Sequence, residues 1–172
     1  MDVRPIESPR DLQGVNRVNV LAWRAAYDGI LPADVLDGRD ADLPLVEARE
    51  QYDRLRDATG CFLVAEDDAG EVRGYVYVRW GDDTKEFVGD TAAGLKEIYV
   101  HPDDWGEGVG SRLLDRALAE APESVDAVRL EMLADNDVAA GFYESRGFRR
   151  VHETEFELDG DAYPTVVYER EL

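Results

Sequence analysis

Glycine occupies every second position from Gly106 through Gly108 to Gly110. A β-type run, Leu95 to Val100, leads into this loop through a His-Pro turn, and an amphipathic helix follows at once. The first amides of a helix have no partner within the helix, and the helix dipole favours negative charge at that end. A glycine loop that opens into such a helix therefore predicts a bound phosphate or similar anion.

The loop matches neither of the two common glycine-rich phosphate motifs. Ser111 follows Gly110 directly, whereas a mononucleotide P-loop needs lysine there. A dinucleotide fingerprint needs glycine or alanine at the serine position, and it follows its strand almost immediately, whereas His101 to Trp105 intervene in this chain. A tight turn that needs positive φ is the structural alternative, and one glycine would satisfy it. Three alternating glycines before a helix favour a ligand.

Two glutamates lie within apolar, strand-like runs. Glu131 interrupts the run from Val128 to Met132, and Glu97 lies in the run that precedes the glycine loop. A carboxylate in such a place needs a partner or a function. If the two runs form neighbouring strands, both glutamates can reach the space between them and serve as a general base.

The remaining reactive groups argue against metal or covalent chemistry. The chain has two histidines, His101 and His152, and one cysteine, Cys61, which excludes an intrachain disulfide and a cysteine-cluster metal site. Cys61 opens a predicted strand, so we expect a buried structural thiol. No serine or cysteine pairs with a histidine, which argues against a covalent intermediate.

The elements that position these groups can be predicted from periodicity and turn residues. Ser8 as N-cap and Pro9 at the first helical position start a helix that extends to about Ala26. The other elements predicted before the glycine loop are a strand at Val3 to Pro5, helices at Ala33 to Leu36 and Leu45 to Asp57, strands at Cys61 to Glu66 and Val72 to Trp80, a polar insert at Gly81 to Glu86, and a long strand that ends at Val100.

Beyond the loop, the helix stops before Pro122. The elements that follow are a strand at Ala127 to Leu133, a helix capped by Asp135 to Asp137 that ends at Gly147, and strands at Phe148 to Leu158 and Tyr163 to Glu169. Strands and helices in this order predict an α/β fold with a mixed sheet, in one domain over residues 1–172.

Composition and charge exclude several classes of function. Acidic residues number 39 against 19 basic ones, for a net charge of −20, and the acids are spread along the whole chain. A uniform excess predicts adaptation to a high-salt cytoplasm, with attraction of a basic partner as the alternative. We expect no nucleic-acid partner because no basic face is visible. We also expect no membrane partner and a cytoplasmic location, since no long apolar run or signal core is present.

A second motif follows the glycine loop. Asn136 precedes Tyr143 by seven residues, and Glu144 to Phe148 complete an Asn…Phe-Tyr-Glu-x-x-Gly-Phe pattern. Together with the glycine loop, this pattern closely resembles the GNAT N-acetyltransferase superfamily. The resemblance implies a GNAT-type α/β (α+β) fold, with a mixed, mostly antiparallel, twisted sheet of about six to seven strands flanked by helices.

The resemblance also implies acetyl-CoA as cosubstrate, with no metal. In the family, the strand before the glycine loop diverges from its neighbour and its exposed backbone pairs with the pantetheine arm. Asn136 matches the family's cofactor-contacting asparagine, and Tyr143 matches the tyrosine that faces the cofactor's sulfur. The other implied contacts are Ile98, Tyr99 and Val100 for the pantetheine arm, and Gly106, Glu107, Gly108, Val109, Gly110 and Ser111 for the pyrophosphate.

The resemblance implies direct transfer of the acyl group in a ternary complex. Tyr143 is the candidate acid, Glu131 occupies the position of a catalytic glutamate in some members, and Glu97 is the second candidate base. Trp105 stands where the family usually has glutamine or arginine, so we expect phosphate binding to rely on backbone amides. Arg112, in the first turn of the helix, is the candidate for compensating charge.

The acceptor is the least defined part of the prediction. The resemblance implies a primary amine of a small molecule or a peptide, and it leaves a homodimer open. A CoA-binding sensor or assembly subunit without activity is the alternative. Family resemblance places substrate choice in the segments Trp23 to Leu36, Gly81 to Gly94 and Asp159 to Pro164. The aromatic candidates for the pocket are Trp23, Tyr27, Trp80 and Phe87.

Overall fold

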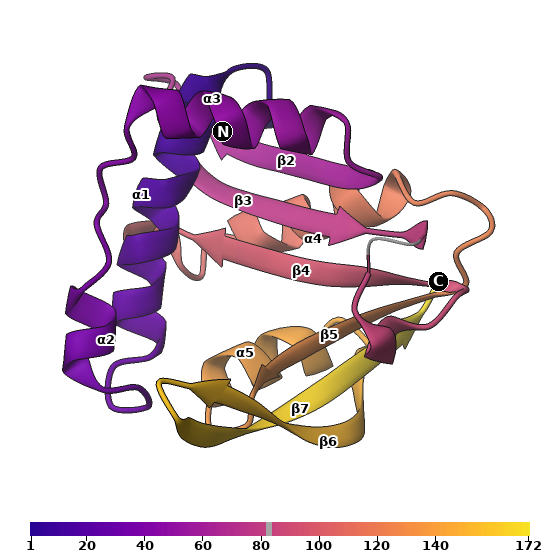
Figure 1. Cartoon of the computed structure of the whole chain (residues 1–172). Helices are drawn as coiled ribbons and strands as arrows, with labels where there is room; N and C mark the ends of the chain where they lie inside the picture. The colour runs from indigo at the N-terminus through magenta and orange to yellow at the C-terminus, as the bar shows by residue number, and fades with distance from the viewer. Residues whose placement is uncertain (82–83) are drawn as a thin grey trace.

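In the computed structural model, which describes residues 1–81 and 84–172, seven strands form one sheet with helices on both faces (Figure 1). The strands are β1 (Asp2–Pro5), β2 (Gly60–Glu66), β3 (Val72–Arg79), β4 (Ala92–Val100), β5 (Ala127–Leu133), β6 (Arg149–Leu158) and β7 (Asp161–Glu171). The helices are α1 (Pro9–Ala26), α2 (Ala33–Asp37), α3 (Leu45–Arg56), α4 (Val109–Ala119) and α5 (Asp137–Glu144), with short 3-10 turns η2 (Glu86–Val88) and η3 (Pro102–Asp104).

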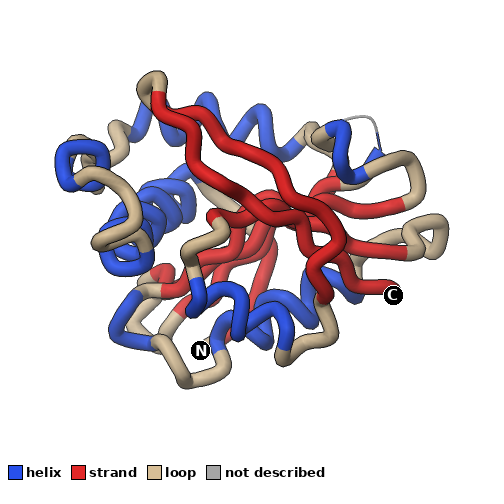
Figure 2. Tube along the Cα trace, turned by 90° about the horizontal axis from the view of Figure 1, so that it is seen from below, coloured by secondary structure: helices blue, strands red, loops and turns tan. Residues whose placement is uncertain are grey.

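The sheet runs in the order β1-β2-β3-β4-β5-β7-β6, and every neighbouring pair is antiparallel except β4 and β5. The final strand of the chain therefore inserts between β5 and β6. Figure 2 shows β6 and β7 as a long two-stranded ribbon that ends at the C-terminus. The predicted mixed, mostly antiparallel sheet flanked by helices is confirmed.

Side chains that alternate along β2 bury the two faces of the sheet against different helices. Val64 packs with Val18 of α1, whereas Leu63 and Ala65 belong to the main core with Leu113 of α4. A strand places successive side chains on opposite faces, so one run of apolar residues serves both layers. This arrangement holds α1 and α4 rigidly on either side of the central strands.

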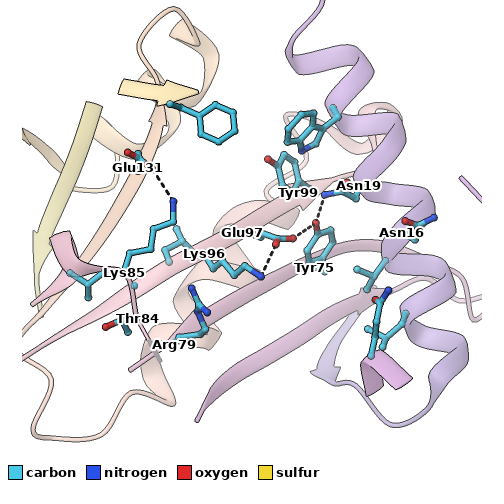
Figure 3. Close-up of a pocket in the computed structure, with 18 of the residues that line it drawn as sticks. Asn16, Asn19, Tyr75, Arg79, Thr84, Lys85, Lys96, Glu97, Tyr99 and Glu131 are labelled. Atoms are coloured by element: carbon cyan, nitrogen blue, oxygen red, sulfur yellow. Dashed lines mark hydrogen bonds and ion pairs between the residues drawn. The ribbon is translucent and has the colours of Figure 1, made fainter. Parts of the chain in front are cut away.

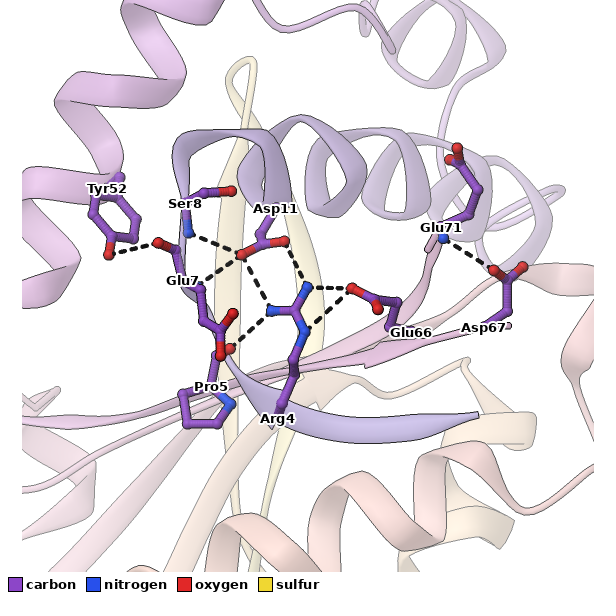
Figure 4. A network of polar contacts seen from close by, with 9 residues as sticks. All are labelled: Arg4, Pro5, Glu7, Ser8, Asp11, Tyr52, Glu66, Asp67 and Glu71. Atoms are coloured by element: carbon purple, nitrogen blue, oxygen red, sulfur yellow. Dashed lines mark hydrogen bonds and ion pairs between the residues drawn. The ribbon is translucent and has the colours of Figure 1, made fainter. Parts of the chain in front are cut away.

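Arg4 joins β1, β2 and α1 through one charged network (Figure 4). Its guanidinium donates to both carboxylate oxygens of Asp11, at 2.9 and 3.2 Å, and also to Glu66. Asp11 accepts from the amides of Glu7 and Ser8 as well, at 2.7 and 3.0 Å. Partial burial raises the pKa of Asp11, but Arg4 and the two amides outweigh it, so this pKa lies below its usual value. The network fixes the start of α1.

Several predicted boundaries move by a few residues. The strand expected from Leu95 begins at Ala92, and the last strand extends from Asp161 to Glu171 because it pairs along its whole length with β5 or β6. Residues 82 and 83 of the predicted polar insert lie outside the described residues. Within the described part of the chain, no helix is both long and apolar enough to cross a membrane.

Candidate active site

The central feature of the site is the separation of β4 from β5. The two strands pair in parallel over three positions only, from Ala92 opposite Ala127 to Gly94 opposite Arg129. A register shift follows in the β3–β4 ladder, where Tyr77 faces Glu97 and the next residue of β3 faces Leu95. Such a bulge bends a strand and increases its twist. The far ends of β4 and β5 therefore diverge, and cavities open at the gap.

A cavity of about 360 Å³ lies between β4, the glycine loop, the first turn of α4 and α5. Eleven positions were predicted to contact the cofactor, and ten of them line this cavity: Ile98, Tyr99, Val100, Gly106, Gly108, Val109, Gly110, Ser111, Asn136 and Tyr143. Glu107, the remaining position, is exposed and is not among the lining residues. We call this space the cofactor cavity. The end of α1 contributes Tyr27 to its wall.

The three glycines of the loop serve different purposes. Gly106 and Gly108 have φ values of +83° and +78°, which side-chain-bearing residues rarely adopt. Gly110 lies inside α4, and a β-carbon there would come within 3.1 Å of the Phe142 ring. The first two glycines therefore shape the loop, and the third lets α4 approach α5.

Arg146 supplies a cationic side chain beside the first turn of α4, and among the described residues Lys96 is the other cation that lines the cofactor cavity. Its guanidinium donates to the Ser111 hydroxyl and, at 2.8 Å, to the carbonyl of Phe142, and it stacks 3.8 Å from the centre of the Phe142 ring. Arg112, the sequence-based candidate for this role, is exposed and does not line the cavity. Sequence reasoning missed Arg146, although it lies only four residues after Phe142, in the turn that follows α5.

The acidic residues near the loop are partly neutralised. Asp104 accepts from Arg73 at 2.8 Å, so the negative charge of this carboxylate is compensated within the protein. Asp103 is exposed at the surface, and its amide donates to Nδ1 of His101 at 3.2 Å. The ring nitrogen of Trp105 donates to the carbonyl of Val100 at 2.8 Å, which places the indole beside the end of β4.

The backbone of β4 offers polar groups to the cofactor cavity. His101 donates its amide to Arg73 on the β3 side, at 2.8 Å. Because backbone groups alternate along a strand, those of Tyr99 also face β3, and those of Ile98 and Val100 face the gap. The Val100 carbonyl already accepts a hydrogen bond from the Trp105 indole. Tyr99 therefore contributes its side chain, and Ile98 contributes free backbone groups.

Three tyrosines surround the inner end of the cofactor cavity. The hydroxyls of Tyr27 and Tyr99 lie 3.2 Å apart, and Tyr143 is buried against Phe148, with ring centres 5.5 Å apart. Burial raises the pKa of Tyr143 well above its usual value, and the neighbouring Tyr27 adds to the effect. Tyr143 therefore stays protonated at neutral pH, as a proton donor must.

A second cavity, of about 480 Å³, opens on the α1 side of β4 (Figure 3). It is lined by side chains of α1, β3, β4 and β5, by the segment before η2, and by Phe156 of β6. Trp23 and Phe87, two of the predicted aromatic candidates, lie here, whereas Trp80 lines neither cavity. The turn at 159–164 does not contribute. We call this space the acceptor cavity.

Both candidate bases lie where the two cavities meet. Glu97 and Glu131 line each of them, together with Tyr99. Tyr75 donates to Glu97 at 2.8 Å, and Asn19 donates to the hydroxyl of Tyr75 at 2.6 Å, which forms a chain from α1 to β4. Asn19 and Tyr75 were not predicted as site residues, since in the sequence Asn19 resembles an ordinary helix residue and Tyr75 an ordinary core residue.

Glu131 is held by partners from two other elements. Lys85 approaches one carboxylate oxygen at 2.9 Å, and the hydroxyl of Thr165 donates to the other at 3.2 Å. Lys96 lies 3.4 Å from Glu97 in the same way. Each glutamate is therefore paired with a lysine in the cavity, as Figure 3 shows.

The remaining candidates for reactive groups lie elsewhere. Cys61 is buried in the main core, where burial raises the pKa of its thiol to about 11. His152 is exposed on β6. Among residues 1–81 and 84–172, no cluster of three or more His, Cys, Asp or Glu side chains is arranged to hold a metal ion.

The sequence model of the acetyltransferase (GNAT) family matches residues 23–148, which is most of the chain. The chain belongs to the GNAT acetyltransferase family. Peptidyl-lysine N-acetyltransferase YjaB of Salmonella typhimurium is 30% identical over 92 residues, which cover 54% of this chain and 61% of that protein. The protein of the same name from Escherichia coli is 33% identical over 72 residues, which cover 42% and 46% of the two chains.

Solved structures of GNAT-like proteins share the fold over nearly the whole chain. The PaiA N-acetyltransferase of Thermoplasma acidophilum, in complex with coenzyme A, has a TM-score of 0.73 at 19% identity and covers 99% of this chain and 98% of its own. The putative acetyltransferase yncA of Salmonella typhimurium, with acetyl-CoA, has a TM-score of 0.72 at 18% identity and covers 99% and 93%. At these identities, the likeness shows the fold alone.

Proposed function

We propose that this chain is an N-acetyltransferase that moves an acetyl group from acetyl-CoA to a primary amine of a small molecule or peptide. The observation that carries the proposal is the junction of the two cavities at Glu97, Tyr99 and Glu131. A transferase needs two binding spaces that meet at the reacting atoms, with groups there that can accept and donate protons. Residues 1–172 then act as one acyltransferase domain.

The residues of the cofactor cavity fit acetyl-CoA. The positive-φ loop and the first turn of α4 would hold the pyrophosphate, with Arg146 beside Ser111 as a cation. Free backbone groups of Ile98 would pair with the amide-bearing pantetheine arm, and Asn136 would contact it from α5. Bound acetyl-CoA supplies an activated thioester carbonyl.

Direct transfer requires three proton movements. An amine of the lysine type has a pKa near 10.4, so it must lose a proton before its nitrogen can attack. Glu131 or Glu97 would accept that proton. The nitrogen then forms a bond to the carbonyl carbon, the carbon–sulfur bond breaks, and Tyr143 gives its proton to the departing thiolate. The nitrogen then releases its second proton, which returns Tyr143 to its protonated form.

The proposal is tested by measuring thiol release from acetyl-CoA across a panel of amines, in an assay run at high salt. We expect coenzyme A to raise the melting temperature and at least one amine to release thiol. If coenzyme A stabilises the protein but no amine causes thiol release, the N-acetyltransferase proposal is wrong and the non-catalytic sensor is supported instead. The pH dependence of turnover in Glu131→Gln and Glu97→Gln decides which glutamate is the base, because only loss of the base removes the acidic limb.

Adaptation to high salt, a cytoplasmic location and a homodimer remain predictions. The uniform excess of acid supports the first of them, since screening at high ionic strength weakens the repulsion among exposed carboxylates. Melting temperature as a function of salt concentration tests it. We expect stability to rise with added potassium chloride, and a fall would contradict the prediction.

A further inference from the structure

The only two lysines of the sequence, Lys85 and Lys96, both line the acceptor cavity. Arg39 and Arg79 line it as well. Among the described residues, four cationic side chains therefore face this space, against the two carboxylates Glu97 and Glu131. The chain as a whole has the opposite balance, with 39 acidic and 19 basic residues. Counted over the described residues, the lining of the acceptor cavity reverses the charge balance of the protein.

The four cations come from separate parts of the chain. Arg79 ends β3, Lys96 lies at the bulge of β4, and Lys85 precedes η2. Arg39 lies between α2 and α3 and stacks 4.0 Å from the ring centre of Trp23 on α1. Figure 3 shows Arg79, Lys85 and Lys96 extending into the same space. Their convergence is a property of the folded chain and of no single motif.

The lysines and the arginines differ in how their charges are compensated. Lys85 and Lys96 are each paired with a glutamate, at 2.9 and 3.4 Å. Within residues 1–81 and 84–172, neither Arg39 nor Arg79 makes an ion pair with a carboxylate, and each instead contacts an aromatic ring. Guanidinium groups bind carboxylate and phosphate with matching geometry. The uncompensated charge of the cavity therefore lies on the groups best suited to bind an anion.

We propose that the acceptor is a small primary amine that also carries an anionic group, of which an α-amino acid is the simplest example. The proposal rests on the proposed function and names its substrate class. The amine would lie between Glu97 and Glu131, and its carboxylate or phosphate would face Arg79, with Arg39 as the second guanidinium on the cavity wall. A volume of about 480 Å³ suits a small molecule. Polyamines and the side chain of a peptidyl lysine lack the anion and would meet repulsion from the two arginines that no carboxylate of the described residues compensates.

Matched pairs of amines test the inference. Each amino acid is compared with the amine formed by its decarboxylation, and O-phosphoethanolamine is compared with ethanolamine, in thiol-release assays at one fixed ionic strength. We expect kcat/KM to be at least about tenfold higher for the anion-bearing member of a pair, since a charge-assisted hydrogen bond is lost with the anion. The amino-acid and phosphate arms show which anion the cavity prefers.

Variants then test whether the cavity cations cause the preference. Arg79→Gln is expected to reduce the ratio within a pair to below about threefold, because one anion-binding charge is lost. Arg49→Gln removes the same charge from an exposed site on α3 and should leave the ratio unchanged. If circular dichroism shows that Arg79→Gln is unfolded, Arg39→Gln replaces it.

The outcomes separate the inference from the proposed function. Equal or better turnover of the anion-free amines overturns the inference and leaves the N-acetyltransferase intact. An unchanged ratio in folded Arg79→Gln and Arg39→Gln overturns the role given to the cavity cations. No thiol release from any amine overturns the proposed function, and the inference falls with it.

Discussion

The two cavities of this protein are built in opposite ways. The cofactor cavity draws most of its wall from two short stretches, residues 95–111 and 130–146, and it uses backbone groups and small residues at the glycine loop. The acceptor cavity is lined by charged and aromatic side chains from α1, β3, β4, β5, β6 and η2 and from the segments that hold Arg39 and Lys85. The first exposes peptide groups at the glycine loop, and the second presents four cations and two carboxylates among the described residues.

This difference separates what the family shares from what a member selects. Backbone amides bind phosphate whatever side chains are present, so a glycine loop keeps its use even in a strongly acidic chain. Side-chain charges recognise one ligand and reject another. The strands β4 and β5 contribute to both walls, so their divergence sets the spacing of the two cavities, which under the proposed function would hold the cosubstrate and the acceptor.

Removal of the Tyr143 hydroxyl from the cofactor cavity should give the largest effect. We expect Tyr143→Phe to lower kcat by about 100-fold, because the departing thiolate loses its proton donor. The KM values for acetyl-CoA and for the acceptor should stay nearly constant, since the phenyl ring still fills its place in the wall of the cofactor cavity and only the hydroxyl is lost. Tyr52→Phe is the control, because the Tyr52 hydroxyl donates to the Glu7 carbonyl outside both cavities. Full turnover in Tyr143→Phe would exclude Tyr143 as the proton donor.

A charge network outside both cavities should affect stability alone. Arg4→Gln leaves Asp11 and Glu66 without their cation, and partial burial makes this costly. We expect the free energy of unfolding to fall by about 2 kcal/mol, which is below the range for a fully buried pair. Denaturant titration measures the loss. A change in KM for either ligand would show that the two cavities depend on this network.

The same network predicts acid sensitivity. The pKa of Asp11 is lowered in the folded state, so its contribution is present above the unfolded pKa and is lost as pH falls through the folded one. With an unfolded value near 3.9, stability should decline below about pH 4. Asp11→Asn should show a shallower decline over this range, and an equal slope would contradict the assignment.

Loss of the Arg146 charge beside Ser111 should have an intermediate effect. We expect Arg146→Gln to weaken coenzyme A binding by about tenfold, because a charge-assisted contact near the pyrophosphate is lost. Binding of pantetheine, which lacks the pyrophosphate, should not change. Arg112→Gln is the matched control, since Arg112 is exposed and lies outside the cavity. Isothermal titration gives all four affinities, and equal losses in both variants would place the pyrophosphate elsewhere.

The glycine loop should show the smallest effect. Gly108→Ala places a β-carbon in open space but at a φ of +78°, so we expect a loss of about 1 kcal/mol from backbone strain alone. Gly70→Ala has the same strain at a φ of +83° in the β2–β3 turn. Both should lose similar stability, and only Gly108→Ala should weaken coenzyme A binding, by about threefold. Equal binding in both variants would argue against a role of the loop in holding the cosubstrate.

Local patterns explain how much of the fold was predictable. The helix from Pro9 to Ala26 was expected with its N-cap and its end, because capping residues and apolar spacing lie within one segment. The position of β7 between β5 and β6 depends on pairing between strands far apart in the chain, so no local pattern could indicate it. The separation of β4 from β5 came from the family resemblance alone, and the structure confirms it.

By itself, the sequence determined the order of the elements, the glycine loop before α4 and the motif that contains Asn136 and Tyr143, because each depends on residues that are close in the chain. Only the tertiary structure decided that Arg146 and not Arg112 meets the loop, and that Lys85, Lys96, Arg39 and Arg79 share one cavity. The physical reason is that side-chain charges act over a few ångströms in space, whereas sequence patterns report neighbours along the chain.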